Sequence, residues 1–201
     1  MKKILIFVLL LISSLVFSQS REATIFFTDG TSVEGYGEIN ENVILFKVEQ
    51  SGIADEWTFD VTKGIEFSGY GYSEKYEYVK LNENKDPKLL AIVDNRSVSL
   101  YRDTKLTTNL LINPFSQTGA VNMVTNAHPL GNSLENIYYV KRENENIATN
   151  ISSNFKKKVS VYFSDCKILI DKINSKKFTS KNIEDLVFYY NDYCGKDEGD
   201  K

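Results

Sequence analysis

The chain has 201 residues, with 24 basic and 27 acidic side chains and a net charge of −3. A weakly acidic balance argues against the basic face that nucleic acid binding requires and against electrostatic docking to an anionic bilayer. We therefore expect no nucleic acid partner. The length is enough for one domain or two small ones.

Residues 1–18 have the pattern of a secretory signal peptide. Two lysines precede fourteen residues that are apolar apart from two serines, and Val16 and Ser18 occupy the −3 and −1 positions of a cleavage site. A spanning helix needs about 20 apolar residues, so the run is too short for a retained anchor. We predict cleavage after Ser18, which leaves 183 residues with 22 basic and 27 acidic groups. The product is predicted to be soluble, periplasmic or secreted, without stable membrane insertion.

The two cysteines, Cys166 and Cys194, are predicted to form a disulfide. An even number of cysteines in an exported chain favours pairing. A C-x-x-C redox motif is absent, and the single histidine, His128, is far from both cysteines in sequence. Since a metal site needs further ligands at close spacing, we expect no metal and no cofactor.

Residues 19–150 are predicted to form a β-rich domain. Asp29-Gly30 is a strong hairpin signal, and Gly35 and Gly37 indicate a bulge or a tight bend in the returning strand. The predicted strands are Ala23–Thr28, Thr31–Ile39, Val43–Val48, Glu56–Asp60, Gly64–Ser68, Tyr76–Leu81, Lys88–Val93, Val98–Arg102 and Ile137–Lys141. Short antiparallel strands with frequent turns predict a curled sheet, a sandwich or a small barrel.

Residues 107–134 interrupt this pattern. The segment has no formally charged residue and contains Pro114, Pro129 and two glycines. Loops of this length are uncommon inside a domain and are usually functional or mobile. The alternative is a hidden pair of strands, because Leu110–Ile112 and Ala120–Val124 are sufficiently apolar.

Residues 151–194 change to a helical period, so the fold class is predicted to be α+β, with two to three helices after the β-rich body. The first helix carries Phe155 and Val159 on one face, and the caps of the next two are expected at Ser164 or Asp165 and at Thr179 or Ser180. The second helix then begins near Cys166 and the third ends near Cys194. These ends are neighbours in an antiparallel helical hairpin, which supports the disulfide. Residues 195–201 are expected to be a disordered tail.

The candidates for chemistry are weak, and we predict no catalytic residue. His128 lacks the spacing that would place an acid and a nucleophile beside it. Acidic side chains cluster in two places, Asp55-Glu56 with Asp60, and Glu34, Glu38 and Glu41. Paired acids of this kind can hydrolyse glycosides, but solvated turns and strand edges are the simpler interpretation. Gly69-Tyr70-Gly71-Tyr72 lacks the third glycine and the helix of a phosphate loop.

Four tyrosines, Tyr70, Tyr72, Tyr76 and Tyr78, are the candidates for binding a partner. Alternation predicts that Val79 and Leu81 face the core, so Tyr76 and Tyr78 face outward. An exposed tyrosine offers a flat apolar ring with a polar end, which suits a protein partner or a saccharide ring. The alternative is that they are half-buried tyrosines of the kind that strands favour.

Three strand segments, Tyr76–Leu81, Val98–Arg102 and Ile137–Lys141, and the stretches Tyr162–Cys166 and Tyr190–Cys194 carry a family resemblance. Together with the signal pattern, they resemble an uncharacterised family of small exported proteins from flavobacteria and their relatives. The resemblance implies export and a helical ending, and it implies no activity.

We therefore expect a non-enzymatic interaction module of the envelope or the medium, with an envelope protein or a glycan as its partner. One alternative is an exported hydrolase acting on a glycan. Another is a β-barrel that binds a small apolar ligand.

Overall fold

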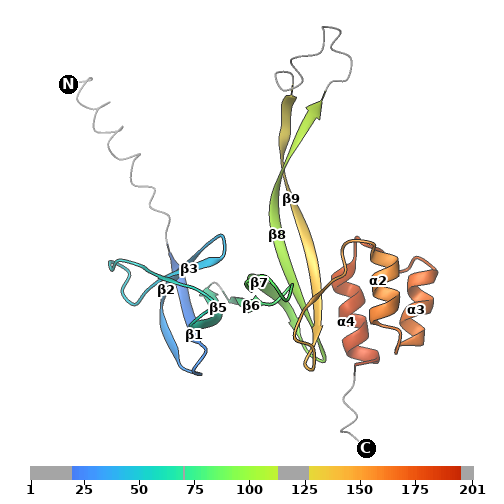
Figure 1. The fold of residues 1–201 in the computed structure, drawn as a ribbon, viewed down its shortest axis with the longest axis horizontal. Helices are drawn as coiled ribbons and strands as arrows, with labels where there is room; N and C mark the ends of the chain where they lie inside the picture. Colours follow the sequence, from blue (N-terminus) through green and yellow to red (C-terminus); the bar gives the residue numbers. More distant parts are fainter. Residues whose placement is uncertain (1–19, 70, 113–126, 196–201) are drawn as a thin grey trace, which may run out of the picture. The chain divides into compact units, whose positions relative to one another are not determined.

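The computed structural model describes residues 20–69, 71–112 and 127–195, and the side chains of these residues apart from 108–132. The predicted signal peptide, Tyr70 and residues 196–201 lie outside the described residues. The fold is α+β, as predicted: a curled, ten-stranded antiparallel sheet is followed by three helices (Figure 1). The chain divides into two compact units, Met1–Glu74 and Lys75–Lys201.

The strands pair in the order β10-β9-β8-β7-β6-β5-β1-β2-β3-β4. The elements are β1 (Arg21–Phe27), β2 (Ser32–Asn40), β3 (Val43–Lys47), β4 (Asp55–Trp57), β5 (Thr62–Gly69), β6 (Tyr72–Val79), β7 (Lys88–Asn95), β8 (Val98–Ile112), β9 (Ala127–Arg142), β10 (Thr149–Asn150), α2 (Phe155–Tyr162), α3 (Lys167–Asn174) and α4 (Ile183–Tyr193).

In the first unit, the sheet curls around a small apolar core. Ile25, Ile44 and Ile65, from β1, β3 and β5, are fully buried. The rings of Phe27 on β1 and Trp57 on β4 meet edge to face, with centroids 5.1 Å apart, although two strands separate β1 from β4 in the sheet. A flat sheet would hold these rings much farther apart, so this contact reports the curl.

Two glycines of β2 permit this curl. A side-chain Cβ on Gly35 would lie 2.4 Å from the Lys47 carbonyl oxygen, and one on Gly37 would lie 2.4 Å from Cδ1 of Ile65. Of the two expectations, a bulge or a tight bend, the bulge is absent from the β1–β2 pairing, because its register runs unbroken through both positions. The glycines allow close packing instead. The predicted hairpin turn is confirmed, with Gly30 at φ +91° between β1 and β2.

In the second unit, the helices cover one face of β8 and β9. Leu100 and Val140, paired across the two strands, are fully buried against Phe163, Leu169 and Leu186 of the helical segment. The opposite face of β8 carries Tyr101, which packs with residues of β6 and β7. Both faces of this part of the sheet are therefore covered.

A buried side chain docks α4 onto the first residue of β8. The Asn191 amide Nδ2 donates a hydrogen bond to the Val98 carbonyl (2.8 Å), and its Oδ1 accepts one from the Val98 N–H (3.0 Å). Asn191 also accepts a hydrogen bond from the Ser97 hydroxyl and donates one to the Asp94 carboxylate. Burial raises the pKa of Asp94, but hydrogen bonds from Arg96 and Asn191 outweigh burial and keep it below its ordinary value. These hydrogen bonds thus fix the position of α4 relative to the start of β8.

The predicted helix caps are wrong. Helix α3 follows Cys166 and α4 follows Asn182, and neither residue makes a side-chain cap hydrogen bond. The Thr179 N–H and hydroxyl instead donate to Oδ1 of Asn182, at 2.7 and 3.1 Å. These side chains close the turn before α4 rather than capping it.

The β8–β9 hairpin is much longer than the sequence indicated. Its strands have 15 and 16 residues, where we predicted Val98–Arg102 and Ile137–Lys141. The uncharged segment 107–134 thus contributes strand residues at both ends, and Leu110–Ile112 belongs to β8, whereas Ala120–Val124 lies outside the described residues. Figure 1 shows β8 and β9 continuing as a two-stranded ribbon beyond the helices of their unit.

Candidate functional site

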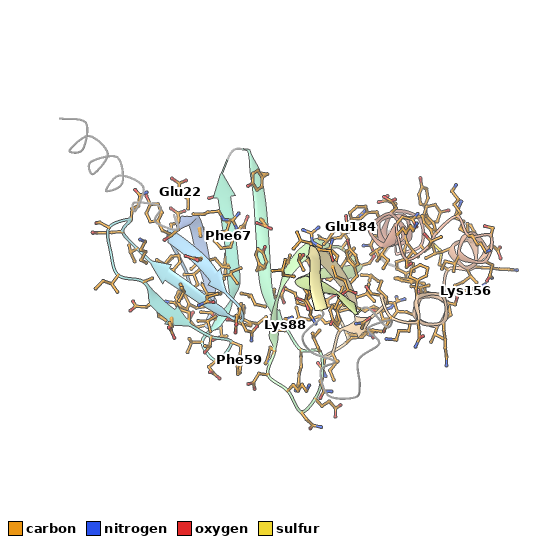
Figure 2. All side chains as sticks on the ribbon, turned by 90° about the horizontal axis from the view of Figure 1, so that it is seen from above. Glu22, Phe59, Phe67, Lys88, Lys156 and Glu184 are labelled. Carbon is orange, nitrogen blue, oxygen red and sulfur yellow. A yellow bond between two sulfur atoms is a disulfide. The ribbon has the colours of Figure 1, made fainter. Side chains whose placement is uncertain are left out.

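The first unit has a hollow of about 540 Å³ where β1 and β6 begin and β5 ends. Figure 2 shows two of its residues, Glu22 on β1 and Phe67 on the neighbouring strand β5. The lining comes from separate segments of the unit and comprises Ser20, Arg21, Glu22, Tyr36, Gln50, Phe67, Ser68, Gly69 and Tyr72. The hollow is large enough for a small ligand.

Arg21 is fixed in this hollow by two contacts. Its guanidinium lies over the Phe67 ring, 3.9 Å from the centroid, and both terminal nitrogens donate to Oε2 of Glu74, at 3.1 and 3.0 Å. The Phe67 ring is 3% exposed, whereas the Arg21 side chain is 46% exposed. The stacked arginine therefore covers an aromatic floor and presents a polar surface to solvent.

The hollow also contains one of the four tyrosine candidates. Tyr72 is 59% exposed, and Tyr36, directly opposite Glu22 in the β1–β2 ladder, is half-buried. Of the other candidates, Tyr70 is outside the described residues. Tyr76 and Tyr78 are half-buried opposite residues of β7. The expected set of outward tyrosines thus contributes one described residue to the hollow.

A second hollow, of about 510 Å³, lies at the open side of β3 and β4. Its walls include Phe27, Phe46 and Trp57, and the exposed side chains of Val48 and Ile53 border it. This lining is more apolar than that of the first hollow, with Lys47, Glu49 and Asp55 as its charged residues.

The acidic clusters from the sequence do not gather in the first hollow. Their residues are exposed on β2, on β4 and in the adjoining turns. Among the described side chains, Glu22 is the carboxylate that lines the first hollow, and Glu49 and Asp55 are the carboxylates that line the second. His128 is placed on strand β9, opposite Leu111, and its side chain lies outside the described ones.

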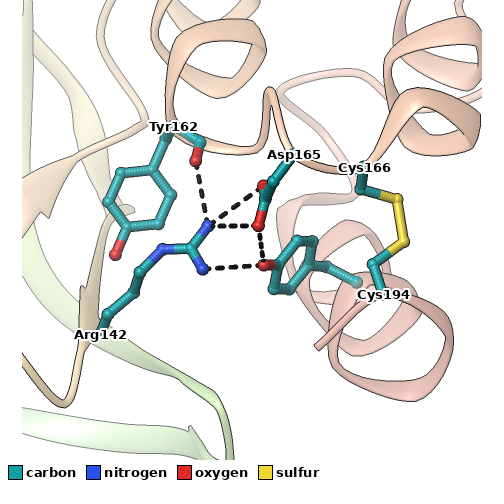
Figure 3. Close-up of a disulfide and its surroundings, with 6 residues drawn as sticks. Arg142, Tyr162, Asp165, Cys166 and Cys194 are labelled. Atoms are coloured by element: carbon teal, nitrogen blue, oxygen red, sulfur yellow. Dashed lines mark hydrogen bonds and ion pairs between the residues drawn. A yellow bond between two sulfur atoms is a disulfide. The ribbon is translucent and has the colours of Figure 1, made fainter. Parts of the chain in front are cut away.

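The structure pairs Cys166 with Cys194, as predicted, with Cα atoms 5.8 Å apart. Cys166 precedes α3 and Cys194 follows α4, so the disulfide joins the start of one helix to the end of the next. Figure 3 shows that a polar cluster lies beside this bond.

Arg142 of β9 is the centre of that cluster. Its Nη1 donates to the Tyr190 hydroxyl (2.9 Å), and its Nη2 donates to the Tyr162 carbonyl (3.2 Å) and the Asp165 carboxylate (3.1 and 3.2 Å). The guanidinium is 5.3 Å from the centroids of both tyrosine rings. Each polar group in this cluster is thus bonded to another, so the cluster fastens the helices to the sheet.

Both tyrosine hydroxyls also donate to acids. Tyr162 donates to Glu145 (2.6 Å) and Tyr190 to Asp165 (2.5 Å). Burial, and then the bond to the acid, raises the pKa of each phenol above its usual value. Sequence reasoning missed this cluster and the first hollow alike, because their members come from segments that are distant in sequence.

Within the described part of the chain, no helix is long and apolar enough to cross a membrane. The same residues hold no group of three His, Cys, Asp or Glu side chains that could bind a metal ion. Comparison of the chain with protein-family models, with curated proteins and with solved structures finds no match.

Proposed function

We propose that this protein is an exported, non-enzymatic binding protein, and that the first hollow takes a neutral sugar ring of a glycan. The observation that carries the proposal is the lining of the hollow, in which an exposed tyrosine ring stands among polar groups. Tyr72 offers an apolar ring face with a hydroxyl at its end. Gln50, Ser68 and Glu22 offer hydrogen-bonding groups around it.

The size of the hollow supports a ligand of one or two rings. Small-molecule sites have volumes of about 300–1,000 Å³ and combine apolar walls with a few polar groups. A hollow of about 540 Å³ lies within that range. Because it opens at the surface, a ring that belongs to a longer chain can enter it.

The charges of the hollow favour a neutral ligand. Arg21 is the cation of the lining, and Glu74 pairs with it at 3.0 Å. Glu22 adds a negative charge to the same lining. A phosphate or carboxylate ligand would compete with Glu74 and approach Glu22, whereas hydroxyl groups can donate to the carboxylate and accept from the guanidinium.

The pattern of residues 1–18 and the pairing of Cys166 with Cys194 support a location outside the cytoplasm, where disulfides persist. The envelope and the medium both contain polysaccharides. The other expected partner is an envelope protein, and the experiment below distinguishes it from a glycan.

The test is affinity electrophoresis of the full chain, after removal of the signal segment, through gels that contain neutral polysaccharides: a β-glucan, a xylan and a mannan. We expect retardation in at least one gel. Tyr72→Ala should weaken binding about tenfold or more, which corresponds to the loss of a central aromatic contact. Tyr193→Ala is the matched control, because Tyr193 is 69% exposed on α4, in the other unit.

The result distinguishes the alternatives. Migration unchanged in every gel would overturn the proposal, and capture of one envelope protein by cross-linking would then favour a protein partner. New reducing ends in a gel that retards the protein would show the glycan hydrolase. Equal retardation of the Tyr72 and Tyr193 variants would place binding outside the hollow.

A further inference from the structure

Among the residues that the structure describes, the outer edge of strand β9 has no paired strand over half of its length. On one side β9 pairs with β8 along its whole length, and on the other side β10 pairs with Val140 and Tyr139. Within the described residues, no strand pairs with this outer edge between Ala127 and Ile137. An unpaired edge presents N–H and C=O groups that an extended chain can bind, so the chemistry of this surface selects a β-strand.

The direction of the backbone groups along this edge follows from Tyr138. Its N–H donates to the Ser152 hydroxyl (2.7 Å), and its carbonyl accepts from the Ile151 N–H (3.0 Å), so both groups point away from β8. The direction alternates along an antiparallel strand. The N–H and C=O of Asn136 and Leu134 therefore point outward as well.

The open edge has definite limits. At one end, Ser152 and Ile151 already occupy the groups of Tyr138. At the other end is Pro129, which has no N–H to donate, and the β8–β9 register shifts beside it. The window between these limits is Gly131–Ile137, and its central residue is Leu134.

We propose that two copies of this chain associate by pairing the Gly131–Ile137 edges of their β9 strands, antiparallel, about a two-fold axis at Leu134. Such an axis brings the outward N–H and C=O of Leu134 opposite the same groups of the second copy. It uses the whole window, since Gly131 then pairs with Ile137 of the second copy. The two hairpins become one four-stranded sheet, and the interface is self-complementary.

Side chains near the axis favour this register. Leu134 lies opposite Leu106 of β8, and these leucines are 72% and 65% exposed, so the ribbon carries an exposed pair of apolar side chains at this position. Pairing about Leu134 aligns four leucines in one row across the new sheet. In the same register Glu135 faces Ser133 of the second copy. Moving the two-fold axis by one residue to Glu135, which shifts the register by two residues, would place Glu135 opposite itself, and like charges directly opposite each other destabilise a sheet.

The test is the mass of the full chain in sedimentation equilibrium, for the wild type and for two variants, Leu134→Lys and Leu134→Glu. We expect the wild type to form a dimer, and each variant alone to be monomeric, with dimerisation weakened by about a hundredfold because like charges meet at the axis. An equimolar mixture of the two variants should dimerise again. This recovery also shows that both variants are folded.

Leu106→Lys is the matched control. It places the same charge on the same face of the ribbon but on the other edge, so the dimer should persist. Four results would overturn the proposal: a monomeric wild type, a dimer that survives in both Leu134 variants, no recovery on mixing, or open-ended growth beyond the dimer. Loss of the dimer in Leu106→Lys alone would assign the contact to β8 and would overturn it too.

Discussion

The two units each contain an arginine stacked on an aromatic ring beside a carboxylate, and the two arrangements differ in what surrounds them. Arg142 lies over Tyr162 and Tyr190, bonds to Asp165, and has a side chain that is 30% exposed. Its partners lie on two helices, α2 and α4, and in the connection between α2 and α3. Bonds that join separate elements resist their separation, so this arginine stabilises the second unit.

Arg21 has the same chemistry in an open setting. It lies over Phe67, pairs with Glu74, and is 46% exposed at the rim of a hollow. Exposed ion pairs contribute little to stability because water and salt screen them. Residue type alone therefore does not separate a structural arginine from a binding one; the number of partners and the adjoining space do.

The largest effect should come from the disulfide, which belongs to the second unit alone. Reduction should lower the free energy of unfolding by roughly 3–4 kcal/mol, as the chain-entropy model gives for a loop of this length. Hydrogen exchange with and without reductant measures the effect by region. Protection should fall in 155–194 and remain unchanged in the strands of the first unit.

The control is Cys166→Ala with Cys194→Ala, whose exchange should not respond to reductant. Equal protection of the oxidised and reduced wild type would show that the covalent bond adds nothing to the noncovalent packing of the helices.

The two arginines can be compared directly by substitution with methionine, which keeps an unbranched apolar side chain. Arg142→Met should cost about 2 kcal/mol, because hydrogen bonds to charged groups are lost at a partly buried site. Arg21→Met should cost less than about 1 kcal/mol. Urea unfolding, monitored by hydrogen exchange in each unit, measures both values. A larger cost for Arg21 would reverse our assignment of the two roles.

An effect smaller than that of Arg142 concerns pH. Tyr162 has a raised pKa in the folded protein, so the folded state holds its proton at pH values where the unfolded chain, with a phenol pKa of about 10, releases it. Its contribution is complete below pH 10 and decreases as the pH rises through the folded pKa. Tyr162→Phe should cost about 1 kcal/mol at neutral pH and should make the alkaline loss of stability shallower. Parallel pH profiles of the two proteins would refute this.

Much of the fold could be predicted, because most of its elements follow local patterns. The Asp29-Gly30 turn and the helical period after Asn150 both gave elements in the right places. The full length of β8 and β9 could not be predicted. Their distal halves are rich in uncharged polar residues without a clear alternation, and the partner strand supplies what the local sequence does not signal.

The candidate sites were less predictable. The disulfide could be predicted, because two cysteines leave one possible pair. Tyr72 was singled out for its residue type, but its hollow also needs Tyr36 and Gln50, and sequence cannot show that distant segments converge. Arg142 carried no signal, since its side-chain partners Asp165 and Tyr190 lie 23 and 48 residues away.

The position of α4 has a consequence for biogenesis. A chain emerges from the ribosome in order, so the face of β8 and β9 that carries Leu100 and Val140 is completed well before the helix that covers it. Until Leu186 and Val187 arrive, the part of this apolar face that α4 covers is open to chaperones and to incorrect partners. Oxidation of Cys166 must wait as well, because its partner follows the last residue of α4. Burial of this apolar face and formation of the disulfide are therefore completed when α4 is in place.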